Sequence, residues 1–577
     1  MPSSKDFNHF VTNPVNIGIS RSIQDLSHSV KFSFNVGEVI PFECFQVLPG
    51  DTISIDTSKV VRIQPMVCPV MDDLFLDTYY FFIPNRLVWD HWINFMGENT
   101  ESAWTPTTEY TIPQIVMPTN GFDAGTIADY LGIPIGIGPN GPVNNSVSAL
   151  PFRAYALTMD QWFRSEVVDN PVHVYKDDTT RTGVNTGDQV TDIELGGKPY
   201  IACKLPDYFN TCTPSPQKGN SVNLFETGKI PVYPTGSRLD QFNSTKFPNG
   251  LASDANHIMW YGVDGTSGTG ITRQDFQVSN ILGASRTSYS NSVGDGVSWS
   301  TPSSGSTYVM PANLYADLAS ATPFTINDLR TAFAIQRYME RQAISGSRYI
   351  EYIKAFYNVD SPDARLQRVE YLGGNRLPLN ITQVTQTSAT DSVTPQGNVA
   401  GMSHTGDNHS DFTKSFTEDG MILGVCVVRY KNSYQQGVNR QWLQKTKYDF
   451  YNPVFANLGN QAVYTDEIYY GIGHSGQANS IFGYQEAWAH YRYLPNRVAG
   501  ELRSAATTPL DMWHFADNYA SRPSLSSSWL HVDKTNVDRA LAVTSSVSNQ
   551  LIADFWLDIS AARPMPSYSI PGLIDHN

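Results

Sequence analysis

Charged residues are scarce in this sequence of 577 residues, of which they make up 16%, whereas ordinary soluble domains hold roughly 25%. Aromatic residues reach 12%. Tyr and Trp are favoured, and Lys and Glu depleted, where protein surfaces become interfaces. The formal net charge is −15, which argues against a dedicated nucleic-acid binder because phosphate contacts need Lys and Arg. The composition therefore predicts a subunit of a larger assembly.

Cysteine is also scarce, and its spacing carries no motif. The five cysteines are an odd number, lie far apart and contain no C-x-x-C, so neither a disulfide framework nor a zinc ribbon is predicted. We interpret them as small buried hydrophobic residues of a reducing compartment; they are Cys44, Cys68, Cys203, Cys212 and Cys426.

Long apolar runs are missing as well. No stretch approaches the roughly 18–20 apolar residues that a membrane span requires. The opening MPSSKDFNHFVTNP has no basic segment followed by an apolar one, as a signal peptide would. We therefore expect no membrane insertion, and folding in a cytoplasm.

Motifs for catalysis or cofactors are weak. Residues 136–141 formally match G-x-G-x-x-G, but the prolines there prevent the helix that a dinucleotide site needs. The HTGDNHSD segment (404–411) has neither a metal-binding helix nor a Cys pair and is interpreted as a polar loop. Glu486 and His490 are interpreted as a structural pair, since no oriented nucleophile is near. The sequence predicts no enzyme, no cofactor and no metal ion.

Strand patterns occur at both ends of the chain. In LIADFWLDIS (551–560) the apolar residues alternate with Asp554, Trp556 and Asp558, which predicts one buried and one open face. DLFLDTYYFFIP (73–84) is a continuous apolar run, as expected for a strand covered on both faces. These patterns predict a mainly β barrel or sandwich whose ends pair, as a single domain over 1–577. Its core strands are expected within 30–90, 420–430 and 550–560.

Other segments are interpreted as insertions into this β domain. A capping pattern and a helical apolar stripe predict a helical insertion over 325–358, and Arg153–Val168 is a second helix candidate. Residues 244–310 are rich in Gly, Ser and Thr, which predicts a surface insertion of turns and short hairpins. Residues 385–412 are predicted to form an exposed polar loop.

Two segments combine basic and aromatic residues. VRYKNSYQQGVNRQWLQKTKYDFY (428–451) has the mixture that stacks bases and neutralises phosphates, but the same mixture is typical of an inter-subunit surface. Its candidate residues are Arg429, Lys431, Arg440, Trp442, Lys445 and Lys447. FGYQEAWAHYRYLPNRVAGELRS (482–504) predicts inter-subunit anchors, which are Trp488, Tyr491, Arg492, Tyr493 and Arg497.

Several long blocks resemble the major capsid protein of the Microviridae, in its gokushovirus branch. They include IPNRLVWDHWINFMGEN, LPFRAYALTMDQWFRSEVV, YNPVFANLGNQAVYTDEIY and WHFADNYASRPSLSSSWLHVDKTNVDRALAV, together with SHSVKFSFNVGEVIPFECFQVLPGDTISID (27–56) and the segment 482–504. The resemblance implies an eight-stranded viral jelly roll, sixty copies of which form a T=1 icosahedral shell around circular single-stranded DNA. It places the chain in the virion, after assembly in the cytoplasm of a host bacterium.

The resemblance also implies partners and an outward projection. The partners are a small basic DNA-packaging protein, an internal scaffolding protein, a minor pilot protein and a host surface receptor. The insertion at 244–310 is expected to project at the threefold axes, where Tyr261 and Trp299 are candidate contacts. The alternatives are a phage tail or receptor-binding protein, and a β-sandwich carbohydrate enzyme with two facing carboxylates.

Overall fold

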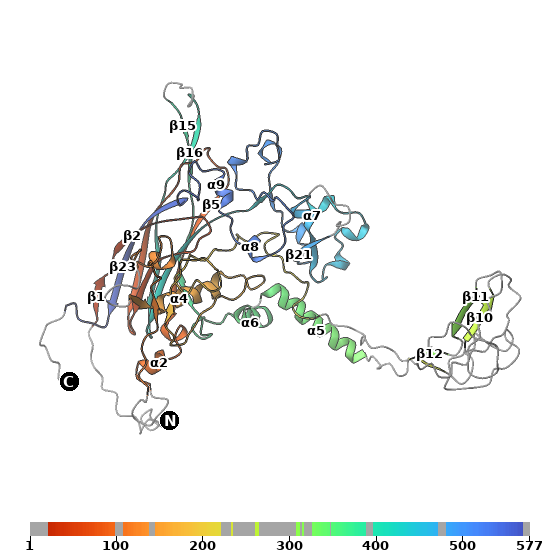
Figure 1. Ribbon diagram of the computed structural model, residues 1–577, viewed down its shortest axis with the longest axis horizontal. Helices are drawn as coiled ribbons and strands as arrows, with labels where there is room; N and C mark the ends of the chain where they lie inside the picture. Colours follow the sequence, from red (N-terminus) through yellow and green to blue (C-terminus); the bar gives the residue numbers. More distant parts are fainter. Residues whose placement is uncertain are drawn as a thin grey trace. The chain divides into compact units, whose positions relative to one another are not determined.

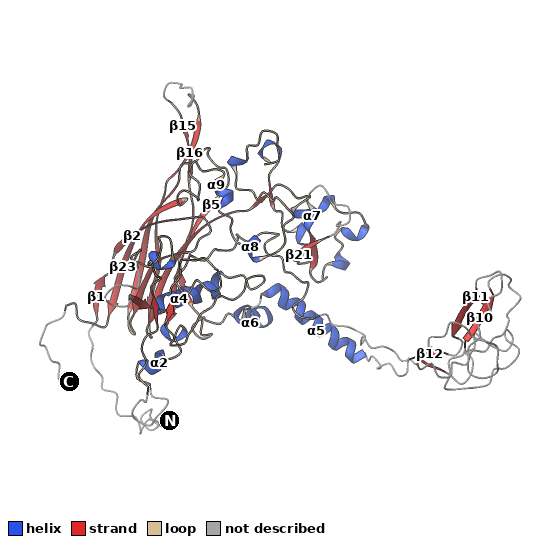
Figure 2. Cartoon of the chain, viewed as in Figure 1, coloured by secondary structure: helices blue, strands red, loops and turns tan. Residues whose placement is uncertain are grey.

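The computed structural model describes residues 21–98, 108–137, 145–220, 232–234, 260–264, 307–311, 314–316, 326–346, 348–387, 396–470 and 480–568. Two compact units are present: Met1–Gly219 with Met339–Asn577 form the first, and Asn220–Tyr338 form the second. The first unit is mainly β, with two five-stranded antiparallel sheets (Figures 1 and 2). Within the described ranges, no helix combines the length and apolarity needed to cross a membrane.

The first sheet joins the two ends of the chain. Its order is β1-β23-β4-β17, and β2 also pairs with β23. In β23 the side chains alternate between buried and exposed from Leu551 to Ala561, which confirms the two faces predicted for this segment. The strands are β1 (Ser22–Asp25), β2 (His28–Phe34), β4 (Thr52–Ile63), β17 (Thr405–Ser415) and β23 (Leu551–Arg563).

The second sheet is buried on both faces. Its order is β13-β5-β18-β3, and β14 also pairs with β5. In β5 nine of the eleven side chains are buried, which confirms the prediction for the run 73–84. Its strands are β3 (Ile40–Val47), β5 (Leu74–Pro84), β13 (Glu370–Gly373), β14 (Arg376–Pro378) and β18 (Gly420–Tyr430).

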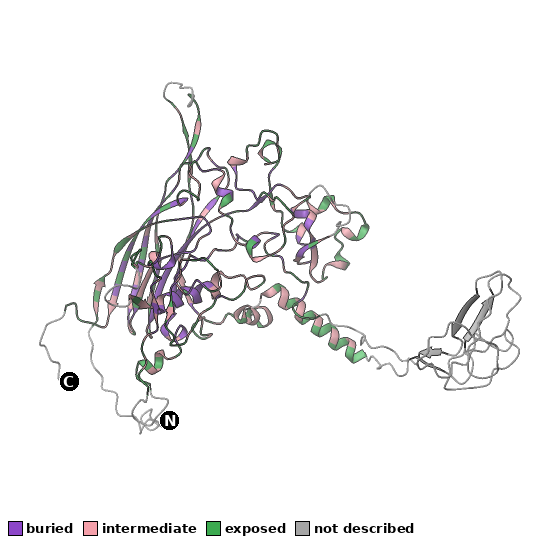
Figure 3. Ribbon diagram, in the orientation of Figure 1, coloured by how far each residue is buried: buried purple, intermediate pink, exposed green. Residues whose placement is uncertain are grey.

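The main hydrophobic core lies between the two sheets, where the ribbons in Figure 3 are mostly buried. The ring of Phe42 in the second sheet lies 5.1 Å from that of Phe555 in the first and 5.6 Å from that of Tyr80. Full burial of one such ring stabilises the fold by about 1.5–3 kcal/mol. This packing makes the two sheets a sandwich.

A second core covers the other face of the β5–β18 sheet. Phe81, Leu423 and Val425 pack there against helix α4 (Leu150–Thr158), which continues as the π-helix η2 (Met159–Phe163). The predicted helix at Arg153–Val168 thus begins three residues earlier and ends at Phe163. Among the described residues, none forms such a cover over the outer face of the first sheet, where Trp556 is 50% exposed.

The remaining short elements lie in the connections between the sheet strands. Between β5 and β13 they are η1 (Asn85–Leu87), α2 (Trp92–Phe95), β6 (Gln114–Val116), α3 (Ile127–Tyr130), β7 (Ser146–Ser148), β8 (Arg181–Thr182) and α6 (Tyr349–Tyr357), with α5 (Ile326–Ser345) spanning the boundary of the two units. Between β18 and β23 they are β19 (Ser433–Tyr434), η5 (Arg440–Trp442), η6 (Lys447–Asp449), η7 (Pro453–Phe455), β20 (Gln461–Tyr464), α7 (Thr465–Ile468), β21 (Ile481–Gln485), η8 (Ala489–Tyr491), β22 (Asn496–Arg497), η9 (Gly500–Leu502), η10 (Asp511–Trp513), α8 (Ser527–Leu530) and α9 (Thr535–Asp538).

The second unit contains two short strand pairs among its described residues. β10 (Trp260–Asp264) pairs with β11 (Thr307–Pro311), and β9 (Val232–Pro234) pairs with β12 (Leu314–Ala316). Tyr261 lies on β10 opposite Met310. Trp299 and most of the predicted insertion 244–310 lie outside the described residues.

The described part of the segment 385–412 forms mainly strands and not the exposed polar loop that the sequence predicts. Residues 399–403 form β16, which pairs with β15 (Ile381–Thr385), and β17 pairs along β4. The apolar alternation is missing because the inward positions of β17 are polar: Asp411 accepts a hydrogen bond from Thr57, and Asp407 accepts one from Asn375 at 2.8 Å. Residues 388–395 and 138–144, the latter within the G-x-G-x-x-G match, lie outside the described residues.

Candidate inter-subunit and nucleic-acid surface

The two basic and aromatic segments lie side by side in the fold. The first leaves the sheet at the end of β18, and its Ser433–Tyr434 form β19. The second contributes Asn496–Arg497 as β22, which pairs with β19 in parallel. Two segments predicted separately from composition therefore build one surface of the first unit.

Arg429 and Arg440 are mostly buried and paired within their own chain, although Arg440 also lines a pocket of this surface; their contact with DNA or with other subunits stays a prediction. Arg429 donates from Nε to Asp77 at 3.1 Å and from a terminal nitrogen to the Tyr79 hydroxyl at 3.0 Å. Arg440 donates to the Ala462 carbonyl at 2.7 Å and pairs with Glu467 at 3.5 Å. Their side chains are only 13% and 17% exposed, so internal carboxylates neutralise both.

Trp488, which the sequence predicts as an inter-subunit anchor, is also turned toward its own chain. Its side chain is only 4% exposed. The indole nitrogen donates to the Phe455 carbonyl at 2.8 Å, and the ring lies 5.6 Å from that of Tyr451. Trp488 therefore anchors 482–504 to its own chain. The sequence predicts a structural pair between Glu486 and His490, but Glu486 instead forms an ion pair with Arg492.

Tyr430, Tyr434 and Phe482 are buried as well, whereas a further set of large apolar residues in and beside the two segments is exposed. Val454 is 85% exposed on η7, Leu494 is 76% exposed and Trp442 is 74% exposed. Tyr451 and Tyr491 bring the two segments together, with ring centroids 6.2 Å apart. We call this set the aromatic surface, and it consists of Trp442, Tyr448, Phe450, Tyr451, Val454, Leu458, Tyr491, Tyr493 and Leu494. Contiguous exposed apolar residues of this kind mark interaction sites.

A basic pocket of about 200 Å³ adjoins the aromatic surface. Trp442 and Tyr493 belong to both, and Arg497 and Arg503 also line the pocket. Among the described residues, neither of these two exposed arginines has a carboxylate in ion-pair contact. Lys445 and Lys447 are exposed nearby in sequence, and Lys431 pairs with Asp73 at 3.4 Å on the surface. We call this the arginine pocket.

His490 also lines the arginine pocket, and its charge state follows from burial. Burial and the neighbouring charge of Arg440 lower the pKa of the imidazole to about 4. Its Nε2 is buried without a hydrogen-bond partner in the described part of the chain. At neutral pH the pocket therefore presents a neutral imidazole together with three arginines, Arg440, Arg497 and Arg503.

Comparison with known proteins identifies the family of this chain. The model of the capsid protein (F protein) family matches residues 14–573. The chain belongs to this family. This capsid protein is 41% identical over 560 residues to capsid protein VP1 of Spiroplasma virus 4, covering 96% of each chain. It is 37% identical to VP1 of Chlamydia phage 1, again over 96% of each chain, and 35% identical to VP1 of Bdellovibrio phage phiMH2K, over 96% and 95%.

These relatives confirm the predicted class of protein. The chain is a gokushovirus-type major capsid protein of the Microviridae, a structural component of the virion that self-assembles into a capsid. The relatives do not favour the tail or receptor-binding alternative. The carbohydrate-enzyme alternative has no support from them either, because the family is one of structural capsid proteins.

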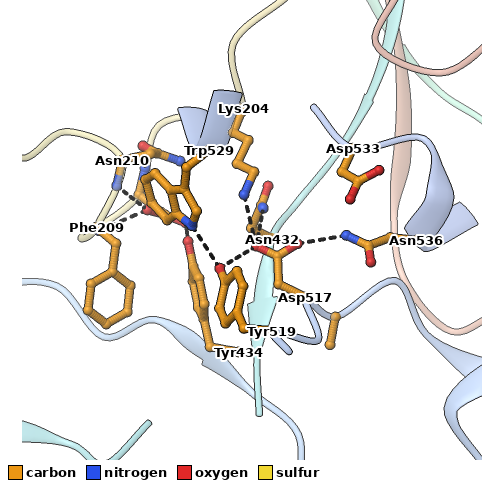
Figure 4. Close-up of polar contacts among 12 residues, drawn as sticks. Lys204, Phe209, Asn210, Asn432, Tyr434, Asp517, Tyr519, Trp529, Asp533 and Asn536 are labelled. Carbon is orange, nitrogen blue, oxygen red and sulfur yellow. Dashed lines mark hydrogen bonds and ion pairs between the residues drawn. The ribbon is translucent and has the colours of Figure 1, made fainter. Parts of the chain in front are cut away.

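A buried polar network joins residues of three separate segments of the capsid protein (Figure 4). Lys204 and Asp517 form an ion pair at 2.8 Å, with side chains 3% and 4% exposed. Asp517 also accepts from Tyr519 at 2.7 Å and from Asn536 at 2.7 Å. Tyr434 of β19 donates to Asp207 at 2.6 Å in the same region.

Sequence reasoning missed this network. Its members come from residues 204–210, 432–435 and 517–536, and no local motif joins them. The available signal was the occurrence of isolated charges within otherwise aromatic stretches, because a buried charge is tolerated only when it is paired. These contacts fasten the connection between β5 and β13 to the connection between β18 and β23.

Proposed function

We propose that this chain is the subunit of a T=1 icosahedral shell of sixty copies, held together in part through the aromatic surface. The observation that carries the proposal is that large apolar side chains in and beside two paired segments stand exposed. Specific interfaces bury about 800 Å² on each partner and are enriched in Tyr, Trp and Arg near their centres. The aromatic surface has this composition.

We propose further that the sandwich is a viral jelly roll. β1 and β2 both pair with β23, and β13 and β14 both pair with β5, so each pair behaves as one interrupted strand. Counted in this way, each sheet has four strands, and strands that follow one another in the chain mostly belong to different sheets. This arrangement is expected for two packed Greek keys. The long insertions then fall in two of the inter-strand connections.

The proposal is tested with two matched valine substitutions. Val454→Asp places a charge on the aromatic surface, whereas Val547→Asp places one at a position that is equally open, since the two valines are 85% and 80% exposed. Both variants should fold as the wild-type chain does, by circular dichroism and thermal unfolding. Electron microscopy of expressed protein should show shells for wild type and Val547→Asp but unassembled chains for Val454→Asp. Shells formed by Val454→Asp, or equal loss in both variants, would overturn the proposal.

The arginine pocket supports a second role, contact with the single-stranded DNA genome. Arg497 and Arg503 offer unneutralised charge, and Trp442 and Tyr493 offer ring faces on which bases stack. Arg497→Gln should lower the slope of log affinity against log salt by about 0.7 for an oligonucleotide. Arg492→Gln is the control, because Arg492 is already paired with Glu486. Equal slopes for wild type and Arg497→Gln would exclude this contact.

The net charge supports the remaining partners. Sixty copies of a chain with charge −15 carry about −900 formal charges around a polyanion, so a small basic packaging protein must offset part of this repulsion. We also propose the internal scaffolding protein, the minor pilot protein and assembly in the bacterial cytoplasm, which the family resemblance implies.

The second unit supports an outward insertion for host attachment. Asn220–Tyr338 forms a compact unit of its own, which contains the whole of 244–310. Replacing 244–310 by a short Gly/Ser linker should leave shells that assemble but no longer adsorb to host cells. Adsorption at the wild-type level would refute the attachment role, and with it the prediction that Tyr261 is a contact residue of this insertion.

A further inference from the structure

A cluster of three metal-binding side chains lies outside the aromatic surface and the arginine pocket. Asp169, Cys203 and His531 each offer one ligand atom, and these atoms all lie within 4.8 Å of one another. Cys203 and Asp169 belong to the connection between β5 and β13, and His531 belongs to the connection between β18 and β23. The three residues are part of the first unit, and no role is assigned to them above.

The backbone holds Cys203 and His531 face to face. The two residues form an antiparallel β-bridge. Lys204 N donates to Leu530 O at 2.9 Å, and Val532 N donates to Ala202 O at 3.0 Å. These flanking bonds make 203 and 531 a non-hydrogen-bonded pair, the arrangement in which opposite side chains lie closest and on the same face.

Asp169 completes the cluster from a separate turn. Its Oδ2 lies 3.3 Å from His531 Nε2 and 3.9 Å from Cys203 Sγ. Ligand distances of about 2.0–2.3 Å in a tetrahedral zinc site put the ligand atoms roughly 3.3–3.5 Å from one another. The separation between Asp169 and His531 matches such a site, that between Asp169 and Cys203 exceeds it by about half an ångström, and the ligand atoms of Cys203 and His531 lie within 4.8 Å of each other.

The carboxylate of Asp169 is held in place and is not saturated. Ser165 N donates to Oδ2 at 3.0 Å, and the Tyr200 hydroxyl donates to it at 3.3 Å. The side chain is 5% exposed, and Oδ1 is buried without a hydrogen-bond partner among the described residues. A buried carboxylate oxygen without a donor is costly, and a bound cation would satisfy it.

We propose that Asp169, Cys203 and His531 bind one zinc ion, which links the two long connections of the sandwich. A thiolate, an imidazole and a carboxylate form a ligand set that suits zinc, whereas magnesium and calcium prefer oxygen ligands alone. Zinc binding replaces the proton of the Cys203 thiol, which passes to solvent. Of the three ligands, His531 also lines a pocket of about 360 Å³.

Metal loading should increase the thermal stability of the chain, because the ion binds the folded arrangement of the three side chains.

The test uses the full chain, purified without chelator, and measures zinc by inductively coupled plasma mass spectrometry. One equivalent is expected in the wild type and in Cys212→Ser, the control for another buried cysteine. Cys203→Ser and His531→Asn should lose it. Tyr200→Phe, which removes a hydrogen bond to the carboxylate, should weaken zinc affinity by about 10- to 100-fold.

Cobalt substitution of the wild-type chain gives a readout that does not depend on any variant folding. A thiolate-to-cobalt charge-transfer band with tetrahedral ligand-field absorption is expected, and zinc should displace both. Absence of retained zinc together with absence of the thiolate band would overturn the proposal. Equal zinc in Cys203→Ser, His531→Asn and the wild type would also overturn it, because the ion would then be bound elsewhere.

Discussion

Asp517 and Lys204 form a buried ion pair whose two partners should contribute very unequally to stability (Figure 4). Asp517 accepts from four donors: Lys204 at 2.8 Å, Asn432 at 3.4 Å, Tyr519 at 2.7 Å and Asn536 at 2.7 Å. Lys204 makes one hydrogen bond to a carboxylate and lies over the Trp529 ring at 4.5 Å. Asp517→Ala and Lys204→Met therefore remove very different numbers of contacts.

The contacts allow the two costs to be estimated. Asp517→Ala leaves a buried ammonium and three neutral donors without their acceptor, and breaking a buried pair from one side costs about 3–5 kcal/mol. Lys204→Met keeps an apolar stem over Trp529 and leaves the carboxylate with three donors. The free energy of unfolding should then fall by about the net contribution of one hydrogen bond to a charged group, about 1–2 kcal/mol, because the variant no longer has to desolvate the ammonium group. The expected difference is about 2–3 kcal/mol.

The difference is measured by urea unfolding of unassembled chains, followed by tryptophan fluorescence. Asp517→Asn serves as the intermediate case, because it keeps one acceptor oxygen and loses the charge. Equal midpoints for Asp517→Ala and Lys204→Met, or a larger loss for Lys204→Met, would refute the reasoning that the carboxylate organises the network.

Three further outcomes are expected. Burial raises the pKa of Glu194 to about 7, above its ordinary value near 4.5. The folded state therefore binds more protons than the unfolded state between these two pH values, and the protein loses stability as the pH rises through them. Glu194→Gln should remove this loss, and urea unfolding at pH 7 and above should show a gain of about 2–3 kcal/mol in the free energy of unfolding. Phe555→Ala empties a fully buried position 5.1 Å from the rings of both Phe32 and Phe42 and should cost about 3–5 kcal/mol, seen as a lower melting temperature. The pKa of His490 is lowered to about 4, so stability should fall as the pH drops from 6.5 to 4, and His490→Gln should flatten this part of the pH profile.

Apolar periodicity was enough to predict the sandwich strands. Leu551–Ala561 alternates because one face meets the core and the other stays open, and Leu74–Pro84 does not alternate because a second core covers its outer face. Both patterns are local, and burial alone decides them. β17 could not be found in this way, because its inward residues meet polar partners such as the buried Thr57 and the half-buried Asn375.

The sequence indicates which segments are rich in basic and aromatic residues, but not which of their side chains are exposed. Composition marked both basic and aromatic segments, but the β19–β22 pairing that joins them is non-local. The same composition could not distinguish Trp488, which turns inward onto the Phe455 carbonyl, from Trp442, which is 74% exposed. Which arginines stay unpaired depends on distant carboxylates, as Asp77 shows for Arg429.

The way in which the two long connections meet bears on how the subunit associates. Apolar packing alone would tolerate sliding between them, because it is not directional, whereas the Lys204–Asp517 network loses a buried hydrogen bond for each displaced group. The two connections are therefore held in one arrangement before any contact with another copy. A preorganised surface has less side-chain and backbone freedom to lose on association. Modest contacts at each neighbour then suffice for a closed shell, and the proposed zinc ion would strengthen the same junction.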